Sequence, residues 1–230
     1  MINDILTNHE KTIESIKHVF YSNTNNTNNT NNTNNTNTLF ISFAGKIDKY
    51  VSVTWFYNQT DFLGNFLFLK NDENENYNTY QDENYLKLIK YYISTLNITD
   101  IITYGPSMGG IASILYGLKL NANLMISIDP NPINFDYNIL LEDIRKYENN
   151  YDFKNKIYLN YTFINDFQTL PEWTEKIINE LKLKNIILTI QPFRSIEHLH
   201  FIPSKEYLMD IIHTNRRLQV KNYTNPVKWI

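Results

Sequence analysis

The chain has no cysteine and only 6 glycines among its 230 residues. Without cysteine it cannot form disulfide bonds, bind zinc through thiolates or use a thiol nucleophile. Long apolar runs are missing too, because no segment reaches the roughly 18 residues needed to cross a bilayer. The N-terminus has no basic segment followed by an apolar core, which is the pattern of a signal peptide. We therefore expect a soluble, cytoplasmic protein with no membrane span.

An excess of basic charge is also missing. The chain has 21 Lys and Arg against 24 Asp and Glu, a formal net charge of −3, and its basic residues form no clustered stripe. This balance predicts neither a nucleic-acid partner nor an anionic membrane surface as a partner. We expect no cofactor and no metal, and nothing in the sequence indicates the oligomeric state.

Asparagine is abundant, and much of it lies in one tract. Residues 23–37 repeat Asn-Asn-Thr and have no apolar side chains to bury, so we expect a disordered loop. The tract separates a predicted N-terminal helix, within residues 1–22, from a domain at residues 38–217, and residues 218–230 are expected to form a C-terminal tail. The total length is that of a single domain with a sizeable core.

After the tract, predicted strands alternate with predicted helices. Several strands are apolar throughout, which is typical of parallel strands covered on both faces. The sequence therefore predicts an α/β protein with a mostly parallel sheet. The predicted strands are residues 38–44, 65–69, 100–104, 123–129, 156–163 and 185–190, and the predicted helices are residues 4–20, 80–96, 111–119, 139–147, 173–183 and 204–213.

Three of the glycines lie in the hexapeptide Gly105-Pro-Ser-Met-Gly-Gly110. It follows an apolar predicted strand and precedes apolar residues at helical spacing, which is the context that a G-x-S-x-G nucleophile elbow requires. In such a strained turn the serine hydroxyl projects from the backbone, and the start of the helix favours a developing negative charge. Gly105 and Gly109 would allow the strand and the helix to cross closely. Ser107 is the predicted nucleophile.

A serine nucleophile needs a base and an acid, which in this type of fold follow the serine in the order acid, then histidine. Only His198 and His200 fall between the last predicted strand and the final helix, where the base is expected. In an extended segment their side chains point to opposite faces, so only one can meet Ser107, and we favour His200. Asp166, just after the fifth predicted strand, is the predicted acid, and Asp129, at the end of the fourth, is the alternative.

An oxyanion hole needs N–H donors aimed at the developing negative charge. One donor is expected from Met108, the residue after the nucleophile, and a second from the loop after the first predicted strand. The candidates in that loop are the backbone amides of Ala44 and Gly45.

Residues 38–212 resemble the α/β-hydrolase-fold proteins often encoded beside capsular-polysaccharide genes. The likeness implies an α/β-hydrolase-like fold, with a mostly parallel central sheet and helices on both faces, and a Ser–Asp–His triad. The chain departs from the family in Pro106 and in the Asn tract, and the tract and composition are also similar to those of giant-virus proteins. The segments that resemble the family are Ile41-Ser-Phe-Ala-Gly45, Trp55-Phe56, Asn65-Phe-Leu-Phe-Leu-Lys70, Tyr104-Gly-Pro-Ser-Met-Gly-Gly110, Asn121-Ala-Asn-Leu-Met-Ile-Ser-Ile-Asp-Pro130 and the late histidine segment.

These features predict a serine hydrolase that acts on a small-molecule ester or an acylated carbohydrate. In this hypothesis Ser107 attacks the carbonyl, and a histidine takes its proton and later activates water. Two alternatives stay open: an acyltransferase, in which an alcohol replaces the water, and a binding module that has the fold without the activity.

Overall fold

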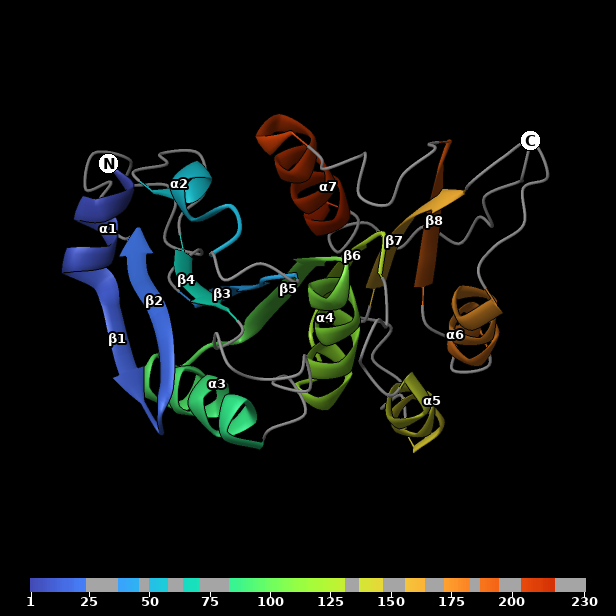
Figure 1. Ribbon diagram of the computed structural model, residues 1–230, viewed down its shortest axis with the longest axis horizontal. Helices are drawn as coiled ribbons and strands as arrows, with labels where there is room; N and C mark the ends of the chain where they lie inside the picture. The colour runs from blue at the N-terminus through green and yellow to red at the C-terminus, as the bar shows by residue number, and fades with distance from the viewer. Residues whose placement is uncertain are drawn as a thin grey trace.

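The computed structural model describes residues 1–23, 37–45, 50–57, 64–70, 83–130, 137–146, 156–163, 172–182, 187–194 and 204–217. In this part of the chain one eight-stranded sheet has the order β1-β2-β4-β3-β5-β6-β7-β8 (Figure 1). Each neighbouring pair in the part of this order that runs β4-β3-β5-β6-β7-β8 is parallel. The strands β1 and β2 add an antiparallel hairpin at one edge. The predicted mostly parallel sheet is confirmed.

The elements follow one another as the alternating pattern predicts. The strands are β1 (Glu10–Ile13), β2 (Ile16–Asn23), β3 (Thr38–Phe43), β4 (Gly64–Leu69), β5 (Asp100–Pro106), β6 (Leu124–Ile128), β7 (Lys156–Phe163) and β8 (Ile187–Arg194). The helices are α1 (Ile2–His9), α2 (Val53–Phe56), α3 (Glu83–Thr95), α4 (Met108–Lys119), α5 (Tyr137–Lys146), α6 (Glu172–Lys182) and α7 (Lys205–Arg217).

Helices cover both faces of the sheet. Buried side chains of α3, α4, α5 and α6 form one hydrophobic cluster with alternate residues of the strands, such as Leu39 and Ile41 of β3. Side chains of α1, α2 and α7 form a second cluster on the other face, where Phe40 of β3 points. The same division is visible in Figure 1, with α3 to α6 below the sheet and α1, α2 and α7 above it.

The predicted helix over residues 4–20 is wrong beyond His9. The helix ends there, and residues 10–23 form the β1–β2 hairpin instead. Glu14 and Ser15, with φ of 51° and 63°, make its two-residue turn. Apolar residues in this stretch fit helical spacing as well as strand spacing. The stretch forms a strand because β2 pairs with β4 along six residue pairs.

Other differences are smaller. The short helix α2 was not predicted, and β8 continues to Arg194 although the predicted strand stops at Ile190. Pro192 lies within β8, and a proline is tolerated there because β8 is an edge strand of the sheet.

Two of the predicted segments fall largely or wholly outside the described residues. These are the Asn tract, of which only its first and last residues are described, and the C-terminal tail. Asn23 ends β2, and Asn37 accepts hydrogen bonds from the amides of Thr99 and Asp100 just before β3. Among the helices that the structure describes, none combines the length and apolar character needed to cross a membrane.

Candidate active site

The turn between β5 and α4 places Ser107 in an unusual backbone conformation. Its φ is 54° and its ψ is −123°, in a region that residues other than glycine rarely adopt. Such a conformation costs roughly 1–3 kcal/mol and occurs most often at functional sites. Backbone hydrogen bonds hold the turn: the Ser107 amide donates to the Ile128 carbonyl at 2.9 Å, and the Gly110 and Ile111 amides donate to the Ser107 carbonyl at 2.8 and 3.3 Å. The predicted strained turn between a strand and a helix is therefore present.

Two glycines allow the backbones to cross beside this turn. A Cβ on Gly105 would lie 2.1 Å from the Gly109 carbonyl oxygen, and a Cβ on Gly109 would lie 2.3 Å from the Phe43 carbonyl oxygen. Backbone atoms cannot move aside as the end of a side chain can. The predicted reason for glycine at both positions is thus confirmed.

Buried hydroxyls fix α4 against the two strands beneath it. The Thr103 hydroxyl donates to the Ser113 carbonyl at 2.8 Å, and the Ser113 hydroxyl donates to the Ile126 carbonyl at 3.1 Å. The Ser127 hydroxyl donates to the Gly110 carbonyl at 3.0 Å. These side chains support the strained turn, and sequence analysis missed them because isolated Ser and Thr residues have no distinctive pattern.

The two predicted oxyanion-hole elements lie beside Ser107. Met108 is the first residue of α4, where an amide has no acceptor within the helix. Gly45 lies against the nucleophile, since a Cβ there would be 3.5 Å from the Ser107 Cβ and 3.2 Å from the Pro106 carbonyl oxygen. The Ala44 amide instead donates to the Leu69 carbonyl at 2.9 Å, so it belongs to the sheet. Gly45 is the better candidate of the two.

The predicted acid and bases lie outside the described residues. Asp166 belongs to residues 164–171, which follow β7, and His198 and His200 belong to residues 195–203, which follow β8. Because β5, β7 and β8 are parallel, β7 and β8 end on the same side of the sheet as the end of β5, which leads into Ser107. The topology is therefore compatible with the predicted order of acid and base.

The described histidines lie elsewhere. His18 is on β2, three strands away from β5, which is about 14 Å at the usual strand spacing. Its ring contacts the Tyr92 hydroxyl at 2.8 Å and the Ile16 carbonyl at 3.0 Å, and burial lowers its pKa. His9 ends α1, where its ring packs against two tyrosines, and His213 is on α7. None of these three is a predicted base.

Tyr104 is the described titratable side chain nearest to the nucleophile along β5. Burial raises the pKa of Tyr104 to about 12, so its phenol stays neutral near pH 7. A neutral phenol does not take the proton of a serine hydroxyl, so Tyr104 is not a candidate base.

Asp129, the alternative acid, adjoins the nucleophile through the backbone. It follows Ile128, whose carbonyl accepts the Ser107 amide, and its own φ is 43°. Its side chain is buried, with 6% of the residue exposed. Aspartate adopts a positive φ more readily than most residues, so what sets Asp129 apart is its burial beside the turn.

No group of three His, Asp or Glu side chains suited to a metal ion occurs within the described ranges. Among the described residues, the groups around Ser107 are backbone amides, a helix N-terminus, the serine hydroxyl and the buried Asp129 side chain. Such a set suits attack on a carbonyl and stabilisation of the resulting oxyanion.

Comparison with known proteins identifies the fold. Models of protein families have no match to the chain, and neither do curated protein sequences. Among solved structures, Est1E from Butyrivibrio proteoclasticus matches with a TM-score of 0.59 and 12% identity, over 92% of this chain and 98% of that one. A thermostable esterase matches with a TM-score of 0.61 and 14% identity, over 90% of this chain and 61% of that one.

A third similar structure is FphF, a fluorophosphonate-binding serine hydrolase of Staphylococcus aureus. It has a TM-score of 0.54 and 12% identity, over 93% of this chain and 97% of that one. The likeness to proteins of capsular-polysaccharide loci and of giant viruses finds no support in these comparisons. At identities this low the similarity establishes the architecture alone, and this chain has the α/β-hydrolase fold.

Proposed function

We propose that this protein is a serine esterase that uses Ser107 as its nucleophile. The observation that carries the proposal is the positive φ of Ser107 between β5 and α4, with Gly45 so near that a Cβ on it would lie 3.5 Å from the Ser107 Cβ. Strain of this kind persists only where the surrounding structure enforces it, and here it presents a hydroxyl at the start of a helix. The similar solved structures, several of which are esterases, agree with the proposal.

The reaction follows from the groups around Ser107. The Ser107 oxygen bonds to the ester carbonyl carbon while a histidine takes the hydroxyl proton. The amides of Met108 and Gly45 stabilise the oxyanion, and the alcohol leaves with the proton from the histidine. Water then attacks the acyl-enzyme with the same histidine as base, which releases the carboxylic acid and restores Ser107.

The base in this proposal is His200 or His198, and the acid is Asp166 or Asp129. Alanine substitution of the true base should lower kcat by several orders of magnitude, whereas the other histidine should tolerate the change. Asp166→Asn and Asp129→Asn distinguish the acids in the same way. Activity should also rise with pH through the pKa of the histidine.

The proposed substrates are small esters, including acylated carbohydrates. A similar structure of Est1E holds ferulic acid, an aromatic carboxylic acid, so aromatic acyl groups belong in the test set. The test is hydrolysis of p-nitrophenyl acetate, an acetylated monosaccharide and a feruloyl ester, with and without an added alcohol. Release of acid into water supports an esterase, and acyl transfer to the alcohol in its place would indicate a transferase.

Ser107→Ala is the decisive variant in this assay. It should lose turnover of every ester while it keeps the fold. Ser94→Ala, an exposed serine on α3, is the matched control and should retain the wild-type rate. Turnover that survives in Ser107→Ala would exclude Ser107 as the nucleophile.

A further inference from the structure

The N-terminal hairpin contacts the chain segment that follows the oxyanion loop. This segment, residues 50–57, begins five positions after Gly45 and contains α2. We call residues 50–57 the anchor segment.

Side-chain hydrogen bonds hold the anchor segment to the sheet: two are donated by the hairpin, one is accepted by it, and one is donated by β3. The Tyr21 hydroxyl of β2 donates to the Val53 carbonyl at 3.1 Å, and the Asn23 amide of β2 donates to the Phe56 carbonyl at 3.0 Å. The Tyr50 hydroxyl donates to a Glu10 carboxylate oxygen of β1 at 2.8 Å. The fourth bond, from the Ser42 hydroxyl of β3 to the Val51 carbonyl, is 3.0 Å.

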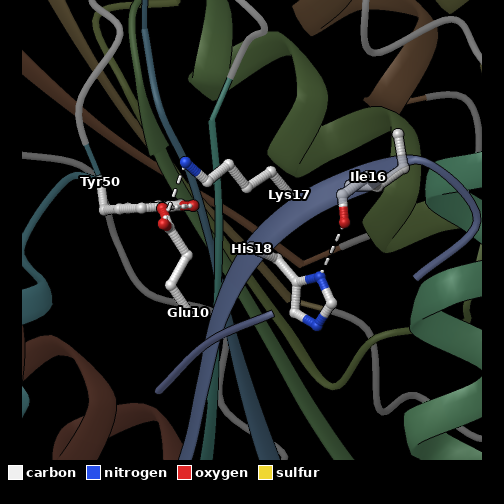
Figure 2. A network of polar contacts seen from close by, with 5 residues as sticks. All are labelled: Glu10, Ile16, Lys17, His18 and Tyr50. Carbon is white, nitrogen blue, oxygen red and sulfur yellow. Dashed lines mark hydrogen bonds and ion pairs between the residues drawn. The ribbon is translucent and has the colours of Figure 1, made fainter. Parts of the chain in front are cut away.

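Tyr50 is the anchor residue closest in sequence to the oxyanion loop, and charged groups surround it. Glu10 accepts its hydrogen bond and also pairs with the Lys17 ammonium at 3.0 Å. The Lys70 ammonium lies 5.4 Å from the centre of the Tyr50 ring. Figure 2 shows Tyr50, Glu10 and Lys17 pointing toward one another on one side of β2, while His18 lies on the other side.

Ala44 and Tyr50, which lie on either side of Gly45 in the sequence, are therefore bound to different strands of the sheet. The Ala44 amide donates to the Leu69 carbonyl on one side, and Tyr50 is bound to Glu10 on the other. An oxyanion donor works only when it is fixed in place before the charge develops, and a displacement of about 1 Å can cost about a hundredfold in rate.

We propose that the Tyr50–Glu10 contact makes the N-terminal hairpin a positioning element for the oxyanion donor at Gly45. Tyr50 and Glu10 are positioning residues, because they hold the chain that follows Gly45 and do not touch the reacting atoms. This inference rests on the proposed esterase function. It adds that a contact of residues 10–23, far from Ser107 in sequence, raises the rate of its reaction.

The test uses Tyr50→Phe, which removes the hydroxyl and keeps the ring beneath Lys70. We expect kcat for p-nitrophenyl acetate to fall by about tenfold with KM within about twofold, because the lost contact orients a transition-state donor. The Ki of a trifluoromethyl ketone, whose adduct with a serine carries an oxyanion, should rise by the same factor. Tyr91→Phe, at an exposed tyrosine on α3, is the control and should change neither value.

Glu10 supplies the conservative comparison. Glu10→Gln keeps an acceptor for Tyr50 and should retain more activity than Glu10→Ala. Glu10→Ala also removes the ion pair with Lys17, so the double variant with Tyr50→Phe should lower kcat no further than Glu10→Ala alone, since the Tyr50–Glu10 contact is already lost in it. Melting temperatures of all variants are measured alongside, to separate positioning from general destabilisation.

The outcomes distinguish this inference from the function on which it rests. An inert wild-type protein overturns both. An active wild type with an unchanged kcat in Tyr50→Phe overturns the positioning inference alone. A loss that consists only of a higher KM, or that parallels a fall in melting temperature, overturns it as well.

Discussion

Backbone strain at Ser107 can be measured through the free energy of unfolding of variants at this position. With φ at 54°, a residue that has a Cβ is strained by roughly 1–3 kcal/mol, and glycine is not. Ser107→Gly should therefore remove a cost that Ser107→Ala retains. Two other effects oppose this gain: glycine makes the unfolded chain more flexible, by about 0.4–1 kcal/mol, and it lacks a buried methyl group worth about 0.8 kcal/mol.

A matched pair at Ser113 cancels the opposing effects. Ser113 is buried in α4, so its change from alanine to glycine loses the same methyl and gains the same unfolded-state entropy in an ordinary helical backbone. At position 113 glycine should be less stable than alanine by about 1–2 kcal/mol. At position 107 glycine should match or exceed alanine. The difference between the two pairs should be about 2 kcal/mol, the strain itself.

The assay is urea unfolding of the four variants, with thermal melting as a second measure. For a chain of 230 residues, about 2 kcal/mol corresponds to roughly 4–8 °C in melting temperature. Both variants at position 107 lack the hydroxyl and should not hydrolyse esters. If the exchange of alanine for glycine has the same effect at both positions, within about 0.5 kcal/mol, the turn at Ser107 stores no strain and the reasoning fails.

Three further predictions concern the scaffold. Gly109→Ala should destabilise the fold by about 3 kcal/mol in urea unfolding, because its Cβ would meet backbone carbonyls of the β3 end; a loss below 1 kcal/mol would contradict the close crossing. Burial lowers the folded-state pKa of His18, so its contribution to stability is intact above the unfolded pKa of about 6.5 and declines as the pH falls toward the folded value. Compared with His18→Gln, the wild type should therefore lose extra stability between pH 7 and 5, at no more than about 1.4 kcal/mol per pH unit, and equal slopes would refute this assignment. Finally, a linker of four Gly and Ser residues should replace residues 24–36 without a change in melting temperature. Asn23 pairs with Gly64 and Leu39 with Asn65, which places the ends of β2 and β3 about 10 Å apart, and a large loss of stability would show that the tract contributes to the fold.

Patterns that depend on neighbours in sequence predicted most of the fold. The apolar strands and the glycines around Ser107 were recognisable because burial on two faces and close backbone crossing restrict the residue types. The β1–β2 hairpin was not, since Ile13, Ile16 and Val19 fit a helical stripe as well as a strand. Pairing with β4, far away in the sequence, determines which of the two forms.

In the candidate site, too, features set by the local sequence could be predicted and contacts between distant residues could not. The positions of Ser107, Met108 and Gly45 could be predicted because each occupies a fixed place relative to a strand or a helix, while their roles in catalysis stay predictions. The contact between Tyr50 and Glu10 could not be predicted, because it joins side chains 40 residues apart whose types occur throughout the chain. The base and the acid stay predictions, since His198, His200 and Asp166 lie outside the described residues.

The most direct test of the central claim is covalent labelling of the intact protein with a fluorophosphonate, followed by peptide mapping. The account predicts one adduct, on Ser107, that is lost in Ser107→Ala and retained in Ser94→Ala. It also predicts that the rate of labelling rises with pH through the pKa of a histidine, near 6.5 before perturbation. A wild-type protein that is not labelled, or an adduct on any other residue, would contradict the claim that Ser107 is an activated nucleophile.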